Sequence, residues 1–129
     1  MERQQFPKAQ ELIVGHFVRH SSTYYKWRIS DRNAKELAKR TPADFDDLAV
    51  AYDKLGQHDK AIETILAKIK RWPDIHRYES EANLGSFLIH SGRFEEGLGH
   101  IDKAIEINPD AHFGREVYQK FLVEYLIKQ

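Results

Sequence analysis

Two histidines stand four residues apart near the start of the chain, a spacing that puts both imidazoles on one face of a helix. His16 and His20 have the spacing of a zinc-binding pair, but the metalloprotease form of the motif needs a glutamate directly after the first histidine. Phe17 occupies that place, and no third ligand stands nearby in the sequence. We therefore expect no metal site and interpret the two residues as a surface or partly buried pair.

Catalytic motifs are missing from the sequence. The glycines of Gly97-Leu98-Gly99 fall inside a helical pattern and lack the Lys-Ser/Thr ending of a phosphate-binding loop. Neighbouring carboxylates such as Glu95 and Glu96 diverge by about 100° on a helix, so they do not form an acid–base pair. The chain has no cysteine, which excludes disulfides, cysteine-ligated zinc and a thiol nucleophile. We expect a non-catalytic protein that needs no cofactor.

Residues 24–32 interleave aromatic and basic side chains, the combination that holds single-stranded nucleic acid by stacking and charge. On a helix, however, Tyr25, Ile29 and Arg32 share one face, so aromatic residues in the core and cations in solvent explain the same pattern. Nucleic-acid binding through the basic N-terminal helices is therefore the least favoured functional alternative.

The overall charge gives no argument for a polyelectrolyte partner, because the 129 residues include 20 Lys and Arg against 20 Asp and Glu. This balance conceals an asymmetry. Residues 1–42 carry nine basic and four acidic residues, whereas residues 43–129 carry eleven and sixteen. The simplest interpretation is that two faces of one domain complement each other. The alternative is that the split orients the chain towards a partner.

The sequence contains neither an apolar run long enough to cross a bilayer nor an N-terminal stretch that resembles a secretory signal. The resulting expectation is a soluble, cytoplasmic protein with no membrane partner. An excised fragment of a longer chain would have lost any export signal that lay upstream.

An internal repeat with a period of 36 residues relates residues 48–74 to residues 84–110. Each copy has two apolar stripes at helical spacing, separated by a turn at Gly56 or Gly92. The matched positions are Leu48 and Leu84, Gly56 and Gly92, Ala61 and Gly97, Ile62 and Leu98, Ile65 and Ile101, Ile69 and Ile105, and Pro73 and Pro109. Each copy is therefore predicted to form a pair of antiparallel helices.

Small residues are expected where the two helices of a pair approach closely, because larger side chains would separate the backbones. These residues are Ala49 and Ala61 in the first copy, and Gly85 and Gly97 in the second. Close helix packing is thus predicted in both copies.

The residues around the turns and the junctions between repeats are predicted to act in turns and at helix starts. His58 and His90 lie near the glycine turns and are predicted to be ordinary turn residues. The junction Pro73-Asp74-Ile75-His76 is repeated as Pro109-Asp110-Ala111-His112. Each aspartate is a candidate N-cap for the next helix, and each histidine is expected to shape a helix start.

These patterns resemble the tetratricopeptide repeat, with copies at about 42–75 and 78–111. The first copy contains Leu48-Ala49-x-x-Tyr52-x-x-x-Gly56-x4-Ala61-x3-Ile65-x7-Pro73, and the second contains Asn83-Leu84-Gly85-x-x-Leu88-x3-Gly92-x4-Gly97-x3-Ile101-x-x-Ala104-x4-Pro109. Phe45 and Glu81 occupy the family's tryptophan position, and Lys68 replaces a small residue late in the second helix. The resemblance implies an all-α, right-handed solenoid of antiparallel helix pairs, with about seven helices.

The regions outside the repeats are predicted to be helical as well. The single domain over 1–129 is divided into an N-terminal helical pair (1–41), two repeats (42–110) and a C-terminal capping helix (111–129). The N-terminal helices are predicted over 7–20 and 21–40, with Tyr25, Ile29 and Leu37 facing inward. The apolar face of the capping helix contains Phe113, Val117, Phe121, Leu122, Tyr125 and Leu126.

In the family that this sequence resembles, the first helices of successive repeats line a groove that holds a peptide. The resemblance transfers that role to Asp46, Val50, Asp53 and Lys54 in the first copy and to Glu79, Asn83, Ser86 and His90 in the second. An acidic groove of this kind favours a partner segment with Lys or Arg. One subclass clamps chaperone C-termini with Lys and Asn where this chain has Asp46 and Val50, which disfavours that partner.

The resemblance therefore implies a non-catalytic scaffold that binds a partner protein or peptide. The alternative from a second functional class is a structural module that forms a homodimer through its terminal helices.

Overall fold

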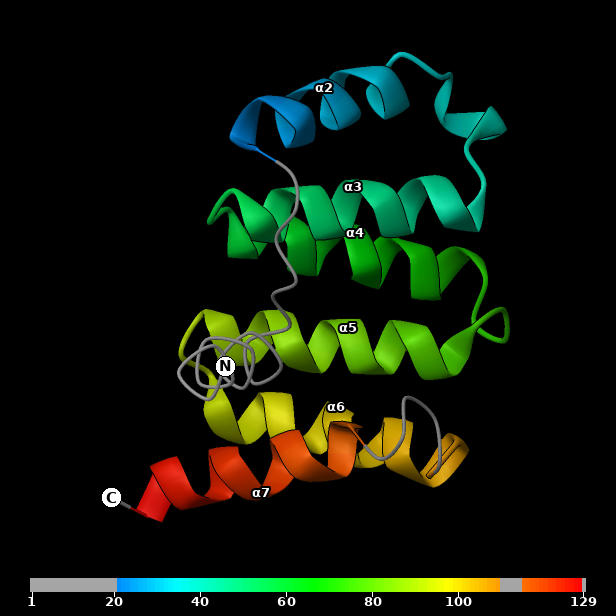
Figure 1. Cartoon of the computed structure of the whole chain (residues 1–129). Coiled ribbons are helices and arrows are strands. Elements are labelled where there is room, and N and C mark those ends of the chain that lie inside the picture. The colour runs from blue at the N-terminus through cyan, green and yellow to red at the C-terminus, as the bar shows by residue number, and fades with distance from the viewer. Residues whose placement is uncertain (1–20, 110–114, 129) are drawn as a thin grey trace, which may run out of the picture.

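The computed structural model describes residues 21–109 and 115–128, which are helical and contain no β-strand (Figure 1). The elements are α2 (Ser22–Asn33), the 3-10 helix η1 (Leu37–Lys39), α3 (Pro42–Lys54), α4 (His58–Arg71), α5 (Arg77–His90), α6 (Phe94–Ile107) and α7 (Arg115–Lys128). None of these helices is long and apolar enough to cross a membrane. The predicted all-α class is confirmed, and the helix predicted over 7–20 lies outside the described residues.

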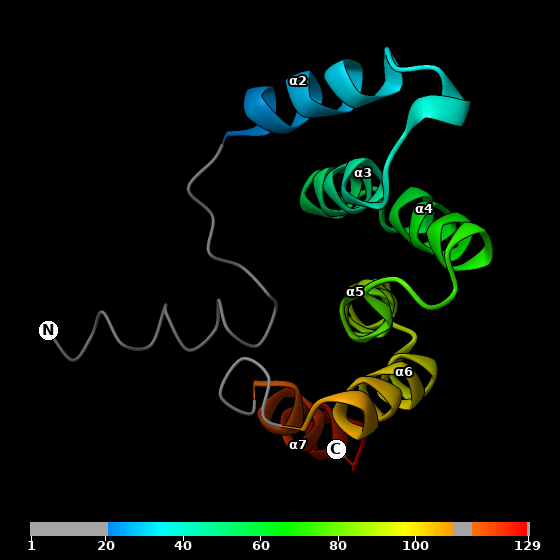
Figure 2. The same ribbon diagram turned by 90° about the vertical axis from the view of Figure 1, so that its right-hand side faces the viewer.

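The helices stack into an arc, which is clearest when α3 and α5 are viewed end-on (Figure 2). α3, α5 and α7 lie on the inner side of the arc, α4 and α6 lie on the outer side, and α2 covers the end next to α3. Helices pack mainly on their neighbours in sequence, as expected for an α-solenoid of the tetratricopeptide type. We call the inner surface of α3 and α5 the concave face.

Local sequence signals determine where the helices of the repeats begin and end. Pro42 occupies the first turn of α3, and Thr41 forms a capping box with Asp44. The backbone N–H of Asp44 donates to Thr41 Oγ1 at 3.2 Å, and the Asp44 carboxylate accepts from the Thr41 N–H at 2.9 Å. The turns after α3 and α5 contain Gly56 and Gly92 at φ angles of 81° and 89°, which glycine adopts without strain.

The main core lies where α3, α4 and α5 meet. Its buried members are Ala49, Ala61, Ile62, Ile65, Leu84, Phe87 and Leu88. The predicted close packing is confirmed, because Ala49 and Ala61 are fully buried. A Cβ added at Gly97 would lie 2.7 Å from the carbonyl oxygen of Gly85. The second helix pair is therefore packed at backbone contact.

The helix predicted over 21–40 is shorter in the structure. α2 ends at Asn33, and the connection that follows includes η1. The Arg40 side chain donates hydrogen bonds to the carbonyl oxygens of Lys35 and Asn33, both at 3.2 Å. Arg71 of α4 donates to the carbonyl oxygens of Leu37 and Ala38, at 2.9 and 3.0 Å. Leu37, which was predicted to face inward, is exposed as a result.

The junction between the repeats also differs from its prediction. α5 begins at Arg77 with His76 as its N-cap residue, so Asp74 is not the N-cap. Asp74 lies inside the preceding turn, two residues too early to cap the helix. His76 has a left-handed backbone at φ 51°, which agrees with its predicted role in shaping the helix start. Asp110 and His112 of the second junction lie outside the described residues.

The contact face of α7 is not the predicted one. Val123 is buried, whereas Phe121, Tyr125 and Leu126 are at least half exposed. Lys120 Nζ lies 2.8 Å from a carboxylate oxygen of Asp102 on α6, which turns the side of α7 that contains Lys120 and Val123 towards α6. Helical periodicity groups residues into faces but does not choose between two apolar faces. The predicted Phe113 and Val117 contacts lie outside the described side chains.

Candidate functional site on the concave face

All eight residues predicted to line the groove lie on the two helices of the concave face. Because their spacings follow the helical period, they form one stripe on each helix. The stripes consist of Asp46, Val50, Asp53 and Lys54 on α3, and of Glu79, Asn83, Ser86 and His90 on α5. Glu79 is exposed, Asp53 is buried and the other six are partly exposed.

Asp46 is held by a buried lysine of α4. The Nζ of Lys68 lies 2.8 and 3.0 Å from the two carboxylate oxygens of Asp46, and Lys68 is fully buried. Burial raises the pKa of the Asp46 carboxyl, and the hydrogen bond from Lys68 offsets only part of this effect. The charge of Asp46 is therefore compensated inside the fold.

Asp53 lies between two histidines. Its Oδ1 is 2.6 Å from Nδ1 of His58, and its Oδ2 is 2.8 Å from Nδ1 of His90. The two imidazole rings are 5.9 Å apart between their centroids. We call Asp53, His58 and His90 the histidine–aspartate cluster. Each of the three side chains offers one potential metal-ligand atom, and these three atoms all lie within 4.8 Å of one another. Among the described residues, no other group of three His, Cys, Asp or Glu side chains comes together in this way.

These contacts change the electrostatics expected for the groove. The sequence makes the α3 stripe acidic through Asp46 and Asp53, but Lys68 and the two histidines bind both carboxylates. Glu79 is the predicted groove carboxylate that stays exposed, with an oxygen 4.0 Å from Nδ1 of His76. Of the two carboxylates of the α3 stripe, Asp46 therefore has its charge compensated by a cation, whereas Asp53 is engaged in hydrogen bonds.

The sequence predicts that His58 and His90 are separate turn residues, and it does not show that both converge on Asp53. A signal was present, because Asp53 and His90 are 37 residues apart, one more than the repeat period. Residues separated by one period lie side by side on successive first helices. His58 approaches Asp53 because the turn at Gly56 reverses the chain between them.

A second buried carboxylate belongs to α5. Glu81 is 2% exposed, and its two oxygens lie 2.6 Å from Nδ1 of His100 and 2.7 Å from Nε of Arg77. Burial alone would raise the pKa of Glu81, but the hydrogen bonds from His100 and Arg77 outweigh it and hold the pKa below its usual value. These partners explain how a glutamate is accommodated at the family's tryptophan position.

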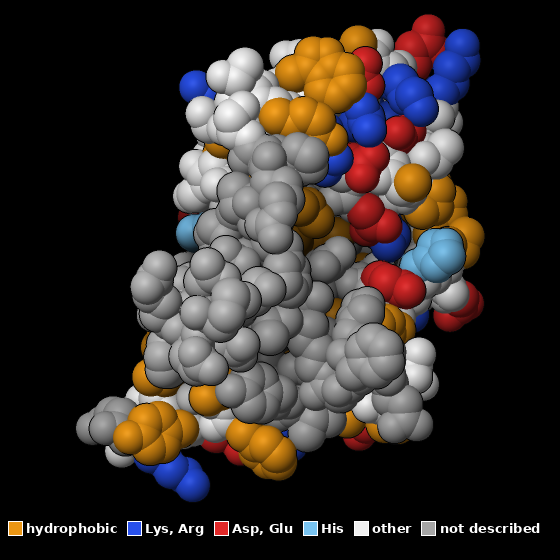
Figure 3. Space-filling view, in the orientation of Figure 1, with side chains coloured by type: hydrophobic (Ala, Val, Ile, Leu, Met, Phe, Trp, Pro, Cys, Tyr) orange, Lys and Arg blue, Asp and Glu red, His pale blue; other side chains and the backbone are white. Residues whose placement is uncertain are grey.

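The basic N-terminal segment and the acidic repeats neutralise each other where α2 meets α3. Arg32 donates two hydrogen bonds to Asp47 at 3.0 and 3.1 Å, and Lys35 Nζ lies 2.8 Å from Asp44. Acidic and basic side chains are interspersed at the upper right of the molecule in Figure 3. These ion pairs support the interpretation that the charge split is complementarity within the fold.

The aromatic and basic residues of 24–32 also contact one another. Tyr25 is buried. The Arg28 guanidinium lies 4.8 Å from the ring centre of Tyr24, and that of Arg32 lies 5.9 Å from the ring centre of Trp27. Intramolecular packing accounts for this segment, so its pattern adds no support for nucleic-acid binding.

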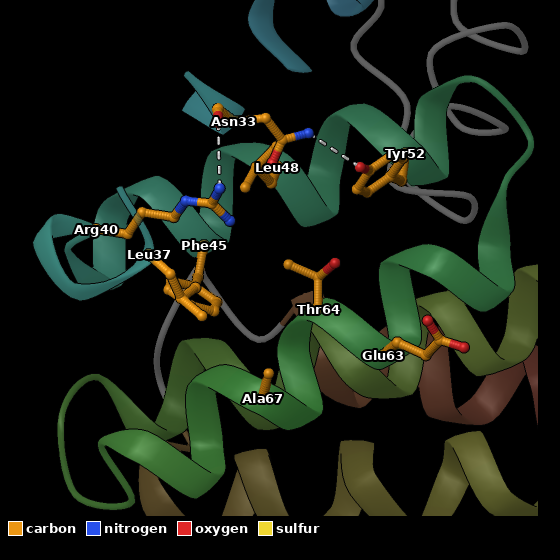
Figure 4. A pocket seen from close by; sticks show the side chains of 9 residues that line it. All are labelled: Asn33, Leu37, Arg40, Phe45, Leu48, Tyr52, Glu63, Thr64 and Ala67. Carbon is orange, nitrogen blue, oxygen red and sulfur yellow. Dashed lines mark hydrogen bonds between the residues drawn. The ribbon is translucent and has the colours of Figure 1, made fainter. Parts of the chain in front are cut away.

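A recess of about 280 Å³ lies between the α2–α3 connection and α4 (Figure 4). Phe45 and Leu48 supply apolar wall, and Asn33 donates a hydrogen bond to the Tyr52 hydroxyl at 3.4 Å. The remaining lining residues are Leu37, Arg40, Glu63, Thr64 and Ala67. No residue of the two predicted stripes lines this recess, so it is a separate surface feature.

Comparison with known proteins agrees with this architecture. Residues 46–70 match the model of a family described as tetratricopeptide repeat. A curated protein of Mycosarcoma maydis, named small glutamine-rich tetratricopeptide repeat-containing protein 2, is 34% identical over 76 residues. The match covers 59% of this chain and 21% of that protein, so the chain spans about a fifth of the relative's length. No solved structure matches the chain.

Proposed function

We propose that the chain, whose residues 46–70 match the tetratricopeptide-repeat model, is a non-catalytic scaffold whose concave face binds a segment of a partner protein. The stacked helices hold the side chains of α3 and α5 in fixed positions. A flexible peptide that binds there loses conformational entropy, whereas the scaffold loses little. Preorganisation is thus the physical basis of the proposed binding.

The observation that carries the proposal is the two-sided character of α5. Leu84, Phe87 and Leu88 are buried, whereas the residues directly before Leu84 and Phe87 are partly exposed. Those residues are Asn83 and Ser86, which belong to the stripe that begins with exposed Glu79. One face of the helix therefore supports the core, and the adjacent stripe offers polar groups to a ligand.

The expected charge preference is local. Since the carboxylates of the α3 stripe are paired internally, a Lys or Arg of the partner is expected to meet Glu79. The rest of the stripe, with Asn83 and Ser86, suits hydrogen bonds to a peptide backbone or to neutral side chains.

Selection from a displayed library of random peptides tests this proposal. We expect peptides selected on the wild-type chain to lose binding to a variant that carries Asn83→Arg and Ser86→Arg. The matched control is Ala67→Arg, which adds the same type of side chain at an exposed position of α4. Circular dichroism would verify that each variant is folded.

Three outcomes separate the possible sites. Loss of binding in the α5 variant with retention in Ala67→Arg supports the concave face. Loss only in Ala67→Arg would move the site to the recess of Figure 4, which Ala67 lines. Selected peptides that bind all variants equally would contradict the proposal, and Glu79→Lys should specifically reject the basic peptides.

Self-association through α7 is a second candidate, favoured by apolar side chains exposed on that helix. Phe121, Tyr125 and Leu126 are each at least half exposed, and clusters of this kind are typical of surfaces that a partner covers. We expect a homodimer in sedimentation equilibrium and a monomer after Tyr125→Asp. A mass that stays monomeric at every concentration would remove this candidate.

A further inference from the structure

We propose that the histidine–aspartate cluster binds a divalent transition-metal ion, with Zn²⁺ as the expected occupant. The three residues come from three helices: Asp53 lies in the last turn of α3, His58 is the first residue of α4, and His90 is the last residue of α5. A bound ion would therefore join the turn of the first repeat to the first helix of the second. The proposal concerns the isolated chain and does not depend on partner binding.

The donor set selects the class of metal. Two imidazole nitrogens and one carboxylate oxygen are ligands that Zn²⁺ and its first-row neighbours accept, whereas Ca²⁺ and Mg²⁺ prefer oxygen alone. Three protein ligands leave the fourth position of a tetrahedral ion to water. His58, about a third exposed at its side chain (29%), puts that position within reach of solvent.

The geometry requires only a small adjustment. In a tetrahedral zinc site with bonds of about 2.0–2.1 Å, the ligand atoms lie about 3.3 Å apart. The distances from Asp53 to the two imidazoles, 2.6 and 2.8 Å, are already shorter than this value. All three ligand atoms lie within 4.8 Å, so coordination needs movements of about 1.5 Å, within the range of side-chain rotation.

Burial makes the cluster a favourable place for a cation. Asp53 is 7% exposed, and a carboxylate removed from water attracts a cation more strongly than one on the surface. The two imidazoles can offer only one proton each to this carboxylate. A divalent ion would supply more charge at the same position, since it binds the carboxylate and both nitrogens together.

The far side of the His90 ring is unengaged. Its Nε2 is buried and has no hydrogen-bond partner. The contact with Asp53 is therefore the hydrogen bond that sets the ring's orientation. No bond on the opposite side opposes the rotation that coordination requires.

Titration calorimetry with Zn²⁺, and Co²⁺ as a spectroscopic probe, tests the proposal on the full chain. His16 and His20 have a metal-binding spacing of their own, so the measurements also use a background with His16→Gln and His20→Gln. We expect that background to bind one Zn²⁺ per chain and to give the visible absorption of tetrahedral Co²⁺. Zn²⁺ should raise its melting temperature, because the ion binds the folded state.

Single substitutions in the same background locate the site. Asp53→Asn, His58→Gln and His90→Gln are each expected to weaken Zn²⁺ binding at least about tenfold, since the loss of a direct ligand exceeds the effect of losing an outer contact. His76→Gln is the matched control, because it removes a largely exposed histidine outside the cluster. Its affinity for Zn²⁺ should remain unchanged.

Two results would overturn the proposal. One is a His16→Gln, His20→Gln background that binds no Zn²⁺, and the other is unchanged affinity after His58→Gln and His90→Gln. If His90→Gln impairs folding by circular dichroism, His58→Gln decides the matter. That substitution affects the more exposed ring and leaves the bond between Asp53 and His90 in place.

Discussion

The two repeats have the same backbone arrangement but carry different side chains at several equivalent positions. Leu48 and Leu84, 36 residues apart, are both buried, and Gly56 and Gly92 turn the chain with the same left-handed backbone. The largest differences fall at positions where helices of a pair meet. These positions show what the repeat requires of its residues.

The first difference is the pair that connects the two helices of each repeat. Asp46 on α3 binds the buried Lys68 on α4 in the first repeat. The same positions of the second repeat hold Ala82 and Ala104, which pack with Tyr78 in a small apolar cluster. An ion pair and an apolar contact therefore occupy equivalent places.

The second difference exchanges an aromatic residue for a charged one. Phe45 packs edge-on against Trp72, with ring centres 5.3 Å apart. Its counterpart is Glu81, which is buried with Arg77 and His100 as partners. An ion-paired carboxylate is thus present in both repeats, partly exposed at Asp46 and buried at Glu81, at neighbouring rather than equivalent positions.

The third difference is how closely the helices approach. The first pair packs through Ala49 and Ala61, and the second through Gly85 and Gly97 at backbone contact. These differences indicate that equivalent positions must fill the available volume and give each buried polar group a partner. They need not hold the same residue. Substitutions that remove a polar partner or change the packed volume should therefore lower the stability of one repeat.

The largest expected effect is the loss of Asp46, because it leaves Lys68 buried without its carboxylate. We expect Asp46→Ala to lower the free energy of unfolding by about 3 kcal/mol. Adding Lys68→Met should recover most of that loss, because an apolar pair then resembles the second repeat. Urea denaturation measures both, and a double variant no more stable than the single one would refute this explanation.

Closer packing in the second repeat should make it less tolerant of added volume. Gly97→Ala places a Cβ 2.7 Å from the Gly85 carbonyl oxygen, and we expect a loss of about 2 kcal/mol. The control is Gly99→Ala in the same helix, where nothing lies within 4 Å and a gain of up to about 1 kcal/mol is expected. Equal melting temperatures for the two variants would show that the helices separate without cost.

The turns should behave alike in the two repeats. Gly56→Ala and Gly92→Ala each introduce a Cβ into open space, so the cost is the left-handed backbone alone, about 1 kcal/mol. Denaturation curves should show equal losses for both variants. A clearly larger loss at one turn would mean that the left-handed backbone costs more there than at the other turn.

The smallest expected effect is an opposite pH response of the Glu81 and Asp46 carboxylates. The pKa of Glu81 is lowered, so its stabilisation is present above its unfolded pKa and is lost as the pH falls through the folded value. The pKa of Asp46 is raised, so its contribution is present at low pH and is lost as the pH rises.

Acid titration of stability measures this contrast. Glu81→Gln should flatten the fall in unfolding free energy between about pH 6 and about pH 3, where carboxylates titrate. The variant with Asp46→Ala and Lys68→Met should show a steeper fall than the wild type. Identical slopes in all three proteins would contradict the assignment of opposite shifts.

Most of the repeat region could be predicted from the sequence, because its signals are local. Apolar stripes identify the helices, and Gly56 and Gly92 mark the turns. The prediction failed where a local signal had two solutions. Proline at residue 42 was compatible with a helix to Arg40 or with an earlier stop at Asn33, and α7 had two apolar faces from which to choose.

The candidate site was predictable only in outline. Spacing places Glu79, Asn83 and Ser86 on one stripe, and the structure agrees with that placement. Spacing does not show that Asp46 and Asp53 are bound by side chains of other helices. That information depends on which helices lie next to each other and at what height.

The helical period, the 36-residue repeat and the residues small enough for close packing can all be read from the amino-acid sequence. These features follow from the burial of one apolar stripe per helix, which each segment specifies within its own few turns. The polar partners, such as Lys68 for Asp46 and the two histidines for Asp53, depend instead on how the helices pack. Hydrogen bonds act over about 3 Å, so they depend on the axial shift between packed helices, and no local pattern encodes that shift.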